Sequence, residues 1–503
     1  MKQKFLKVSA LTLVFIIGLS ACQPDYLNEI EPDQNLIGQF FQSSYSTQPD
    51  PYDISRDIAY EALRVGSEFI GETIPGAGIV LPAFLITLFP QHSEEIDVWD
   101  EIKERVEKVV DEKIDDETYK IMRTKLIKIR FDIRSFLEAS EELKASKWSQ
   151  VDNDMNDYNA FTIDGQEVVL LPLFSQFVNL YLSFYRETVL QGENWHIGQA
   201  ELDISERNLQ RAIPVFSDYV DRWYQQGLND VVANAPKPNS TNTEPFNTIN
   251  RYVREMTLGV LDFRNMWAYF DPVLYPAGAT IHLDREVYSD MIGYASSPFV
   301  FPAAPSQFPD HLKVWAQEGV NAIEVDYPNG GTNGRRDNQA IGSQTNLWEE
   351  FDLTDHPIIG ASAHYSASPY YSDYKLIDAV KFYFDNGDET LESQVIGDGG
   401  KRADPGLINT TVYSYPDHIL SSIYIPQYSY LSDLKANTLQ SVIFGFKRKE
   451  DVNAVLLVLK SIYLGNPEPL NAEQLAELGN ISVSQASGLI DEWHSEHESL
   501  WDK

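Results

Sequence analysis

The chain of 503 residues is strongly acidic, with 75 Asp and Glu against 39 Lys and Arg and a formal net charge of -36 at pH 7. This length predicts two or three domains, and a hydrophobic share of 43% is sufficient to bury their cores. Because so acidic a surface repels phosphate at long range, nucleic acid and anionic lipid are expected to be poor partners.

The N-terminus, MKQKFLKVSALTLVFIIGLSACQPD, has the pattern of an export signal. A basic start precedes an apolar run from about Ala10 to Leu19, which is too short for a stable transmembrane helix. The motif LSAC has the form of a bacterial lipobox, so residues 1–21 are predicted to be a lipoprotein signal peptide and Cys22 to be acylated. We therefore expect an exported protein that is lipid-anchored to the bacterial envelope or surface, or released from it. The alternative is a plain secretory signal with a chance cysteine.

Residues 22–53 are polar and interrupted by proline, which predicts a tether. Residues 54–272 show apolar positions at helical spacing and predict a helical bundle. Within it, residues 96–143 form one long amphipathic stretch that needs neighbours to cover its apolar face. The run VVLLPLFSQFVNLYLSFY (168–185) carries no charge and is apolar on almost every side. A ring of amphipathic helices around such a segment predicts a bundle with a central buried helix.

Residues 273–450 change to short alternating strands separated by Gly, Asn and Asp turns, which predicts an all-β domain. Examples are VNAIEVDYPNGG (320–331) and HILSSIYI (418–425), and DNGDE (385–389) is a hairpin-type turn. Residues 451–503 return to helical patterns and predict a short helical tail. The expected fold class is therefore multi-domain α and β.

Four sequence blocks stand out in the helical region. In chain order they are IPGAGIVLPAF (74–84), LPLFSQFVNLYLSFYRETVLQGENW (171–195), SDYVDRWYQQGL (217–228) and NRYVREMTLGVLDF (250–263), the last followed by FDPVLYP and LDREVYSD. Together they resemble the first domain of the insecticidal δ-endotoxins (Cry toxins). The segments LSSIYI and SVIFGFKRKED resemble the end of that family's second domain, a three-sheet β-prism. The family's third domain, a β-sandwich, is not expected in residues 451–503, because these show helical patterns.

The resemblance implies a pore-forming toxin that binds a receptor or glycan on a target cell, assembles as a homo-oligomer and inserts a helical hairpin into the membrane. Residues 168–185 would span about 27 Å as a helix, close to the hydrocarbon thickness of a bilayer. Their polar side chains recur at four-residue spacing and could face either neighbouring helices or water. The residues assigned to insertion and the pore in this run are Leu173, Phe174, Ser175, Gln176, Phe177, Asn179, Leu180 and Ser183.

The resemblance also implies that the preceding segment, WSQVDNDMNDYNAF (148–161), is the partner of the inserting helix and lines the pore with Asp152, Asp154 and Asp157. Carboxylates in that position would favour cations. The alternative is a solvated acidic face.

Six tyrosines in loop-like segments are candidate receptor or glycan contacts, because aromatic loop tips stack on sugars. They are Tyr365, Tyr370, Tyr371, Tyr374, Tyr428 and Tyr430. The alternative is that half of them pack into the β domain. No spacing of residues predicts a catalytic, cofactor-binding or metal site, so we expect neither an enzyme nor a cofactor.

Two other functions stay open at this stage. One is a lipid-anchored glycan-binding surface protein that uses the bundle as a stalk and never inserts. The other is a relative of the toxins that has lost their activity.

Overall fold

The computed structural model describes residues 98–110, 112–137, 139–236, 243–275, 283, 285–293, 303–316, 319–335, 347–367, 375–385, 390–397, 411–415, 418–426, 428–431, 436–448, 471–472 and 483–496. The predicted signal peptide, Cys22 and the tether lie outside these residues. The chain divides into two compact units, a helical one and a β one. A further helix, α13 (Val483–Glu496), lies in the predicted tail.

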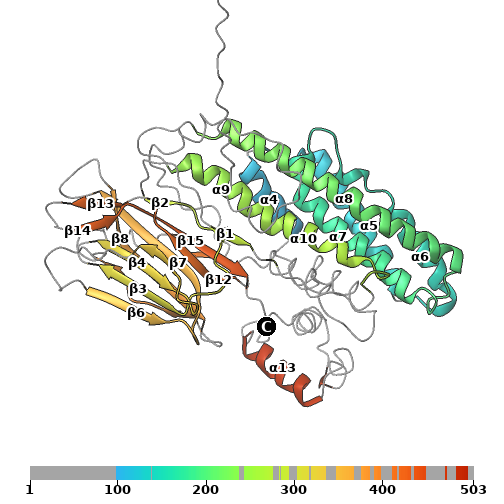
Figure 1. Cartoon of the computed structure of the whole chain (residues 1–503). Helices are drawn as coiled ribbons and strands as arrows, with labels where there is room; N and C mark the ends of the chain where they lie inside the picture. Colours follow the sequence, from blue (N-terminus) through green and yellow to red (C-terminus); the bar gives the residue numbers. More distant parts are fainter. Residues whose placement is uncertain are drawn as a thin grey trace, which may run out of the picture. The chain divides into compact units, whose positions relative to one another are not determined.

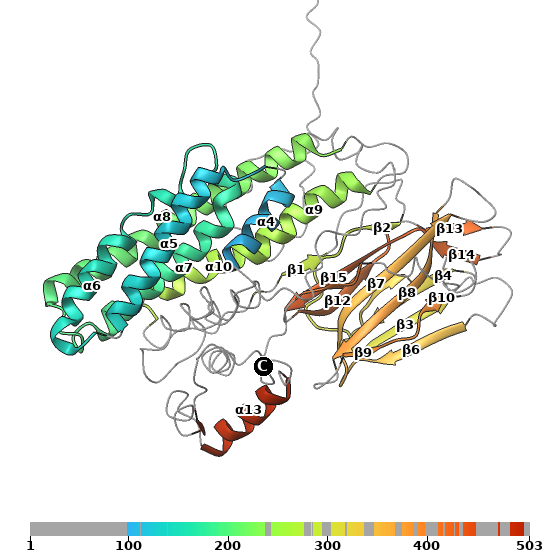
Figure 2. The same cartoon turned by 180° about the vertical axis from the view of Figure 1, so that it is seen from behind.

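The helical unit is built from antiparallel helices (Figures 1 and 2), although the first half of the helix α9, through Asn250, is grouped with the β unit. In chain order these are α4 (Val98–Val110), α5 (Asp116–Leu137), α6 (Glu141–Met155), η4 (Asn159–Phe161), α7 (Glu167–Gln191), α8 (Gln199–Asn234), α9 (Glu244–Met256), η5 (Thr257–Leu261), α10 (Asp262–Met266) and η6 (Trp267–Phe270). The amphipathic stretch 96–143 is therefore not one helix. Asp115 interrupts it, because its carboxylate accepts the backbone N–H groups of Glu117 and Thr118 and caps the start of α5.

Helix α7 is the core of this unit. Every residue from Val169 to Thr188 is buried, which confirms the predicted central helix. Helix α8 covers the side of α7 that faces the viewer in Figure 1, and α4 and α5 cover the side seen in Figure 2. Aromatic rings fill the contacts, with Phe161 stacked on Phe177 at 4.4 Å and Phe174 edge-on to Phe216 at 5.6 Å between ring centroids.

A close approach at Gly227 of α8 brings three helices together. A Cβ atom at this position would collide with the Tyr252 hydroxyl of α9 and would lie 2.5 Å from Cγ1 of Val168 in α7. The Tyr252 hydroxyl donates instead to the backbone carbonyl of Tyr224 at 2.9 Å. Only glycine leaves this space open.

The β unit contains antiparallel sheets. Its strands are β1 (Glu286–Tyr288), β2 (Ile292–Gly293), β3 (His311–Ala316), β4 (Val320–Asp326), β5 (Thr332–Arg335), β6 (Leu347–Asp352), β7 (Ile358–Ala367), β8 (Lys375–Asp385), β9 (Thr390–Glu392), β10 (Ile396–Gly397), β11 (Tyr413–Ser414), β12 (His418–Tyr424), β13 (Tyr428–Leu431), β14 (Ala436–Leu439) and β15 (Ser441–Arg448). The larger sheets have the orders β1-β15-β12, β10-β8-β7-β11 and β5-β4-β3-β6, and β13 pairs with β14. The predicted hairpin at DNGDE is confirmed, because Asp385 of β8 pairs with Thr390 of β9.

One aromatic series connects the three larger sheets. Phe382 of β8 lies 6.4 Å from Phe351 of β6 and 6.1 Å from Phe444 of β15, measured between ring centroids. Phe382 and Phe444 are fully buried, so the sheets share one core. The α-then-β fold class is confirmed, whereas the description of the β unit as a prism stays a prediction.

The buried carboxylate of Glu286 organises the start of the β unit. Its Oε2 accepts the hydroxyls of Tyr288 at 3.0 Å and Tyr424 at 2.9 Å, and its Oε1 accepts those of Ser421 and Ser422 at 2.5 and 2.6 Å. Burial raises the pKa of the Tyr424 hydroxyl above its ordinary value, so this group stays a donor at neutral pH. Four donors thus compensate one buried charge.

We expect Glu286→Gln to lower the free energy of unfolding of the β unit by about 1–3 kcal/mol. The amide places an N–H donor where the carboxylate accepted hydroxyls. Urea unfolding monitored by near-UV circular dichroism measures the effect, with the exposed Glu349→Gln on β6 as control. Equal stability of the two variants would contradict this role.

Candidate functional site

Helix α7 has the length and composition of a transmembrane helix. It has 25 residues, it is the one helix in the described part of the chain with these properties, and 94% of its most apolar stretch is buried inside the protein. A helix of this length spans about 38 Å, which exceeds the hydrocarbon core of a bilayer. The central helix of a soluble bundle can have the same length and composition. The contacts of the α7 side chains therefore distinguish a core helix from one that can also span a membrane.

A polar stripe runs along α7 inside the bundle. It consists of Ser175, Gln176, Asn179 and Ser183, each at most 1% exposed. Asn179 is its centre, because it accepts the indole N–H of Trp267 at 2.8 Å and donates to Gln176 Oε1 at 2.9 Å. The Ser183 hydroxyl donates to the backbone carbonyl of Asn179 at 2.7 Å.

Two polar atoms of this stripe are buried without a hydrogen-bond partner, the Ser175 hydroxyl and Gln176 Nε2. Each such group costs about 1–3 kcal/mol in a folded protein. The bundle therefore satisfies only part of the hydrogen-bonding capacity of the stripe. A state in which these groups meet water would recover that energy.

Helices α6 and α7 are joined by hydrogen bonds as an antiparallel hairpin. The Tyr185 hydroxyl of α7 donates to Asp152 Oδ1 at 2.6 Å and accepts the Asn156 amide at 2.9 Å. One turn away, the Trp148 indole N–H donates to the Thr188 hydroxyl at 2.9 Å. All three contacts lie within the hairpin, so they would survive its departure from the other helices.

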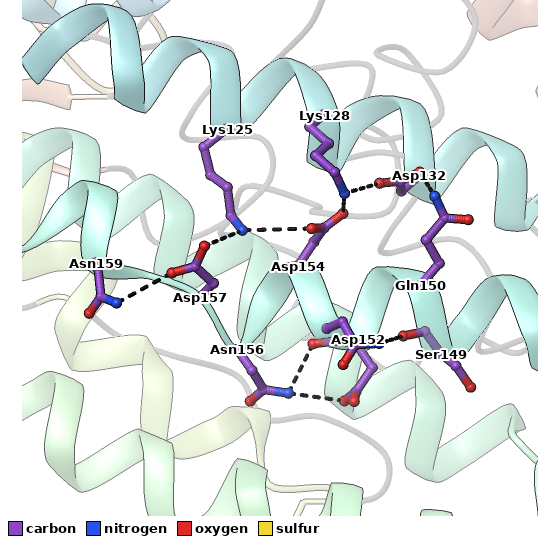
Figure 3. Close-up of polar contacts among 11 residues, drawn as sticks. Lys125, Lys128, Asp132, Ser149, Gln150, Asp152, Asp154, Asn156, Asp157 and Asn159 are labelled. Atoms are coloured by element: carbon purple, nitrogen blue, oxygen red, sulfur yellow. Dashed lines mark hydrogen bonds and ion pairs between the residues drawn. The ribbon is translucent and has the colours of Figure 1, made fainter. Parts of the chain in front are cut away.

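A cluster of charges fastens this hairpin to α5; we call it the clasp, and Figure 3 shows it. It consists of Lys125, Lys128 and Asp132 of α5 with Asp154 and Asp157 at the end of α6. Lys125 Nζ lies 3.0 Å from Asp157 and 3.7 Å from Asp154. Lys128 Nζ bridges Asp154 and Asp132, the latter at 2.8 Å.

The clasp contains a carboxyl group and an ammonium group whose pKa values are both raised, and these two shifts have opposite effects on stability at neutral pH. Burial, and next the hydrogen bond to Asp154, raise the pKa of Asp132, which also accepts the amide of Gln150 at 2.6 Å. Burial alone would lower the pKa of Lys128, but its hydrogen bonds to the two carboxylates outweigh this and raise it. Because the pKa of Lys128 is raised on folding, its contribution to stability is fully present below the ordinary lysine value of 10.5 and is lost as the pH rises through the raised value.

The structure separates the three predicted pore carboxylates. Asp152 lies within α6 and faces Tyr185, while Asp154 is 8% exposed and faces α5. Asp157 follows the end of α6, and its side chain is 61% exposed. A uniformly solvated acidic face is therefore wrong for Asp154. Their assignment to a pore lining stays a prediction.

The candidate receptor tyrosines are not all in loops. Tyr365 lies inside β7, opposite Ile377 of β8, because this strand continues further than its sequence pattern indicated. Tyr428 and Tyr430 lie inside β13 and pair with β14. The loop assignment was wrong for these three residues, while Tyr370, Tyr371 and Tyr374 lie outside the described residues.

The partners of the hairpin could not be predicted from the sequence. Trp267, Lys125 and Lys128 are far from α7 in sequence, and their spacing carries no signal. Arg186 is 7% exposed and donates to the carbonyls of Phe270 at 3.1 Å and Tyr275 at 2.8 Å, contacts that its sequence motif does not indicate. Within the described residues, no group of three or more His, Cys, Asp or Glu could hold a metal ion.

Residues 63–271 match the delta endotoxin N-terminal domain family. Over 219 residues the chain is 29% identical to the pesticidal crystal protein Cry26Aa of Bacillus thuringiensis subsp. finitimus, which covers 41% of this chain and 18% of that protein. Over 254 residues it is 29% identical to Cry9Ca of subsp. tolworthi, covering 47% of this chain and 21% of that protein. The matches thus span about a fifth of the length of these relatives.

The fold agrees with solved structures. The insecticidal crystal protein Cry7Ca1 of Bacillus thuringiensis superposes with a TM-score of 0.63 at 18% identity, covering 79% of this chain and 76% of that one. The structure of PirB superposes with a TM-score of 0.59 at 15% identity, covering 82% and 97% respectively. The resemblance indicated by the four sequence blocks is therefore confirmed: residues 63–271 match the N-terminal domain of the delta endotoxins, and the fold of the chain is that of the Cry structures.

Proposed function

We propose that this protein is a Cry-like pore-forming toxin. It binds a receptor or glycan on a target cell and inserts the α6–α7 hairpin into the target membrane. The observation that carries the proposal is α7 itself, a helix long and apolar enough to span a bilayer, buried along its whole centre and lined with polar groups that the bundle leaves partly unpaired. The match of residues 63–271 to the N-terminal domain of the delta endotoxins supports the same conclusion.

On insertion, the side chains of α7 move from the protein core into the membrane and the pore lumen. The apolar side chains of α7, including Leu173, Phe174, Phe177 and Leu180, leave the protein core for lipid, which is as apolar as that core. The polar stripe turns to the water-filled lumen of a homo-oligomer. Asp152, Asp154 and Asp157 of the partner segment then line the pore and favour cations.

The N-terminal segment and the β domain have separate roles in this proposal. Residues 1–21 direct export, Cys22 carries a lipid anchor, 22–53 form a tether, and the β domain over 273–450 holds the receptor or glycan site, with Tyr370, Tyr371 and Tyr374 as the remaining loop candidates. The protein acts at the target-cell membrane and catalyses no reaction. Because its acidic surface gains little from general lipid electrostatics, recognition of a receptor or glycan determines the target.

The experiment that tests this function is a planar-bilayer recording with the full chain and bilayers containing target-membrane extract. We expect discrete, cation-selective conductance steps. Replacing Asp157, the most exposed of the three carboxylates, with Asn should lower the cation-to-anion permeability ratio by about twofold or more. The exposed Asp218→Asn on α8 is the control and should leave the ratio unchanged.

The alternative is a lipid-anchored glycan-binding surface protein that does not insert. The lipobox motif and the tyrosine-rich segments favour it. Glycan binding without conductance at any protein concentration would support this alternative and contradict a pore.

A further inference from the structure

The outer face of α5 exposes large apolar side chains. Phe131 is 67% exposed, Ile121 49% and Ile127 43%. At 100° per residue these positions lie on one side of the helix, together with Lys120, Thr124 and Lys128. Isolated exposed apolar residues are ordinary, but three on one helical face mark an interaction surface.

Helix α5 carries more basic than acidic residues, although the chain as a whole is acidic. Its sequence DETYKIMRTKLIKIRFDIRSFL contains six Lys and Arg against three Asp and Glu, whereas the whole chain has 39 against 75. An amphipathic helix with cations beside aromatic and aliphatic residues is the composition that lies in the interface of an anionic membrane. Because the Debye length is about 8–10 Å, the potential at this face depends on nearby charges and not on the net charge of the chain. These charges are the cations of α5 and the carboxylates of Asp154 and Asp157, which lie on its flank toward α6.

Lys128 connects this face to the clasp. Its side chain is 53% exposed, yet its Nζ holds Asp154 of α6 and Asp132 of α5. Asp154 is 11% exposed at its side chain and has Lys125 as its other ion-pair partner at 3.7 Å. An anion that reaches the outer face therefore competes with Asp154 for the same ammonium group.

We propose that the outer face of α5, defined by Lys120, Ile121, Ile127, Lys128 and Phe131, docks on an anionic phospholipid surface, and that docking draws Lys128 from Asp154 and releases the α6–α7 hairpin. The release step rests on the proposed pore function, but the docking step does not. The net charge of the chain predicts poor binding to anionic lipid, but this prediction does not hold for the outer face of α5. Docking follows receptor binding and supplies the signal that opens the bundle.

Cosedimentation of the full chain with vesicles tests the docking surface. We expect binding to vesicles of phosphatidylcholine with phosphatidylglycerol to exceed binding to phosphatidylcholine alone, and 0.5 M salt to remove the difference. Phe131→Ser and Lys120→Gln should each weaken binding to the anionic vesicles by about fivefold. Val215→Ser, at a 56% exposed position on α8, is the matched control and should not. All variants share one N-terminus, so any lipid anchor contributes equally.

Dye release from the same vesicles tests the clasp. Asp154→Asn keeps the cations of α5 and removes the group that competes with lipid for Lys128, so binding should be equal or stronger and release should be about tenfold faster. Equal loss of binding in Phe131→Ser and Val215→Ser, or no preference for anionic vesicles, would overturn the docking surface. Unchanged release in Asp154→Asn would overturn the clasp. Binding that depends on Phe131 without any dye release would count against the pore function alone.

Discussion

Replacing Arg186 with alanine is expected to lower the free energy of unfolding of the helical unit by about 3–5 kcal/mol. The guanidinium is buried at the end of α7 and donates to the backbone carbonyls of Phe270 and Tyr275, and at 3.4 Å to that of Tyr269. Without it, these carbonyls lose their charged donor, and the end of α7 loses its attachment to the segment after η6.

Chemical denaturation of the full chain, followed by far-UV circular dichroism, measures this loss. Arg222→Ala, at an exposed position on α8, removes an equal charge and should change stability by about 0.5 kcal/mol or less. Arg186→Lys should recover only part of the stability, because an ammonium group lacks the planar fork that reaches several carbonyls. An Arg186→Ala variant as stable as Arg222→Ala would show that the contacts contribute nothing.

Two apolar substitutions on the polar stripe should have opposite outcomes. Asn179→Leu should destabilise the helical unit by about 2–4 kcal/mol, because the Trp267 indole N–H and the Gln176 side chain lose their shared partner while fully buried. Ser175→Ala removes a hydroxyl that is buried without a partner, so stability should be unchanged or higher.

The thermal unfolding midpoints of the two variants check this prediction. The same pair separates folding from function, since Ser175→Ala should still reduce single-channel conductance if its hydroxyl faces the lumen. Equal destabilisation by both substitutions would mean that the stripe acts only as a core network.

The central position of α7 was predictable because an uncharged run among amphipathic neighbours can be covered on all sides only at the centre of a bundle. The strands around VNAIEVD and HILSSIY were predictable from their alternation and their turns. What could not be predicted depends on long-range packing. Asn179 and Trp267 are separated by 88 positions, and nothing in either segment indicates that they meet.

The acidic partner helix shows the same limit. Its carboxylates were assigned one role because they share one segment, yet Asp152 turns to α7 and Asp154 to α5. The direction in which each carboxylate faces depends on the positions of Lys125 and Lys128, which lie on the preceding helix α5. Tyr365, Tyr428 and Tyr430 lie in segments predicted to be loops, but pairing with the neighbouring strands β8 and β14 places them in strands.

The central claim is that α7 leaves the bundle and presents its polar stripe to water in the membrane. Cys22 is the sole cysteine, so a Cys22→Ser background allows single cysteines to report on α7. Ser183→Cys lies on the stripe, and Val178→Cys lies about 140° away around the helix axis as the matched buried control.

The measurement is modification by a charged, membrane-impermeant thiol reagent, recorded together with bilayer conductance. We predict that neither cysteine reacts in the soluble protein, and that in conducting bilayers Ser183→Cys reacts and its current falls while Val178→Cys stays unreactive. Conducting bilayers in which both cysteines stay unreactive, or react equally, would contradict the account.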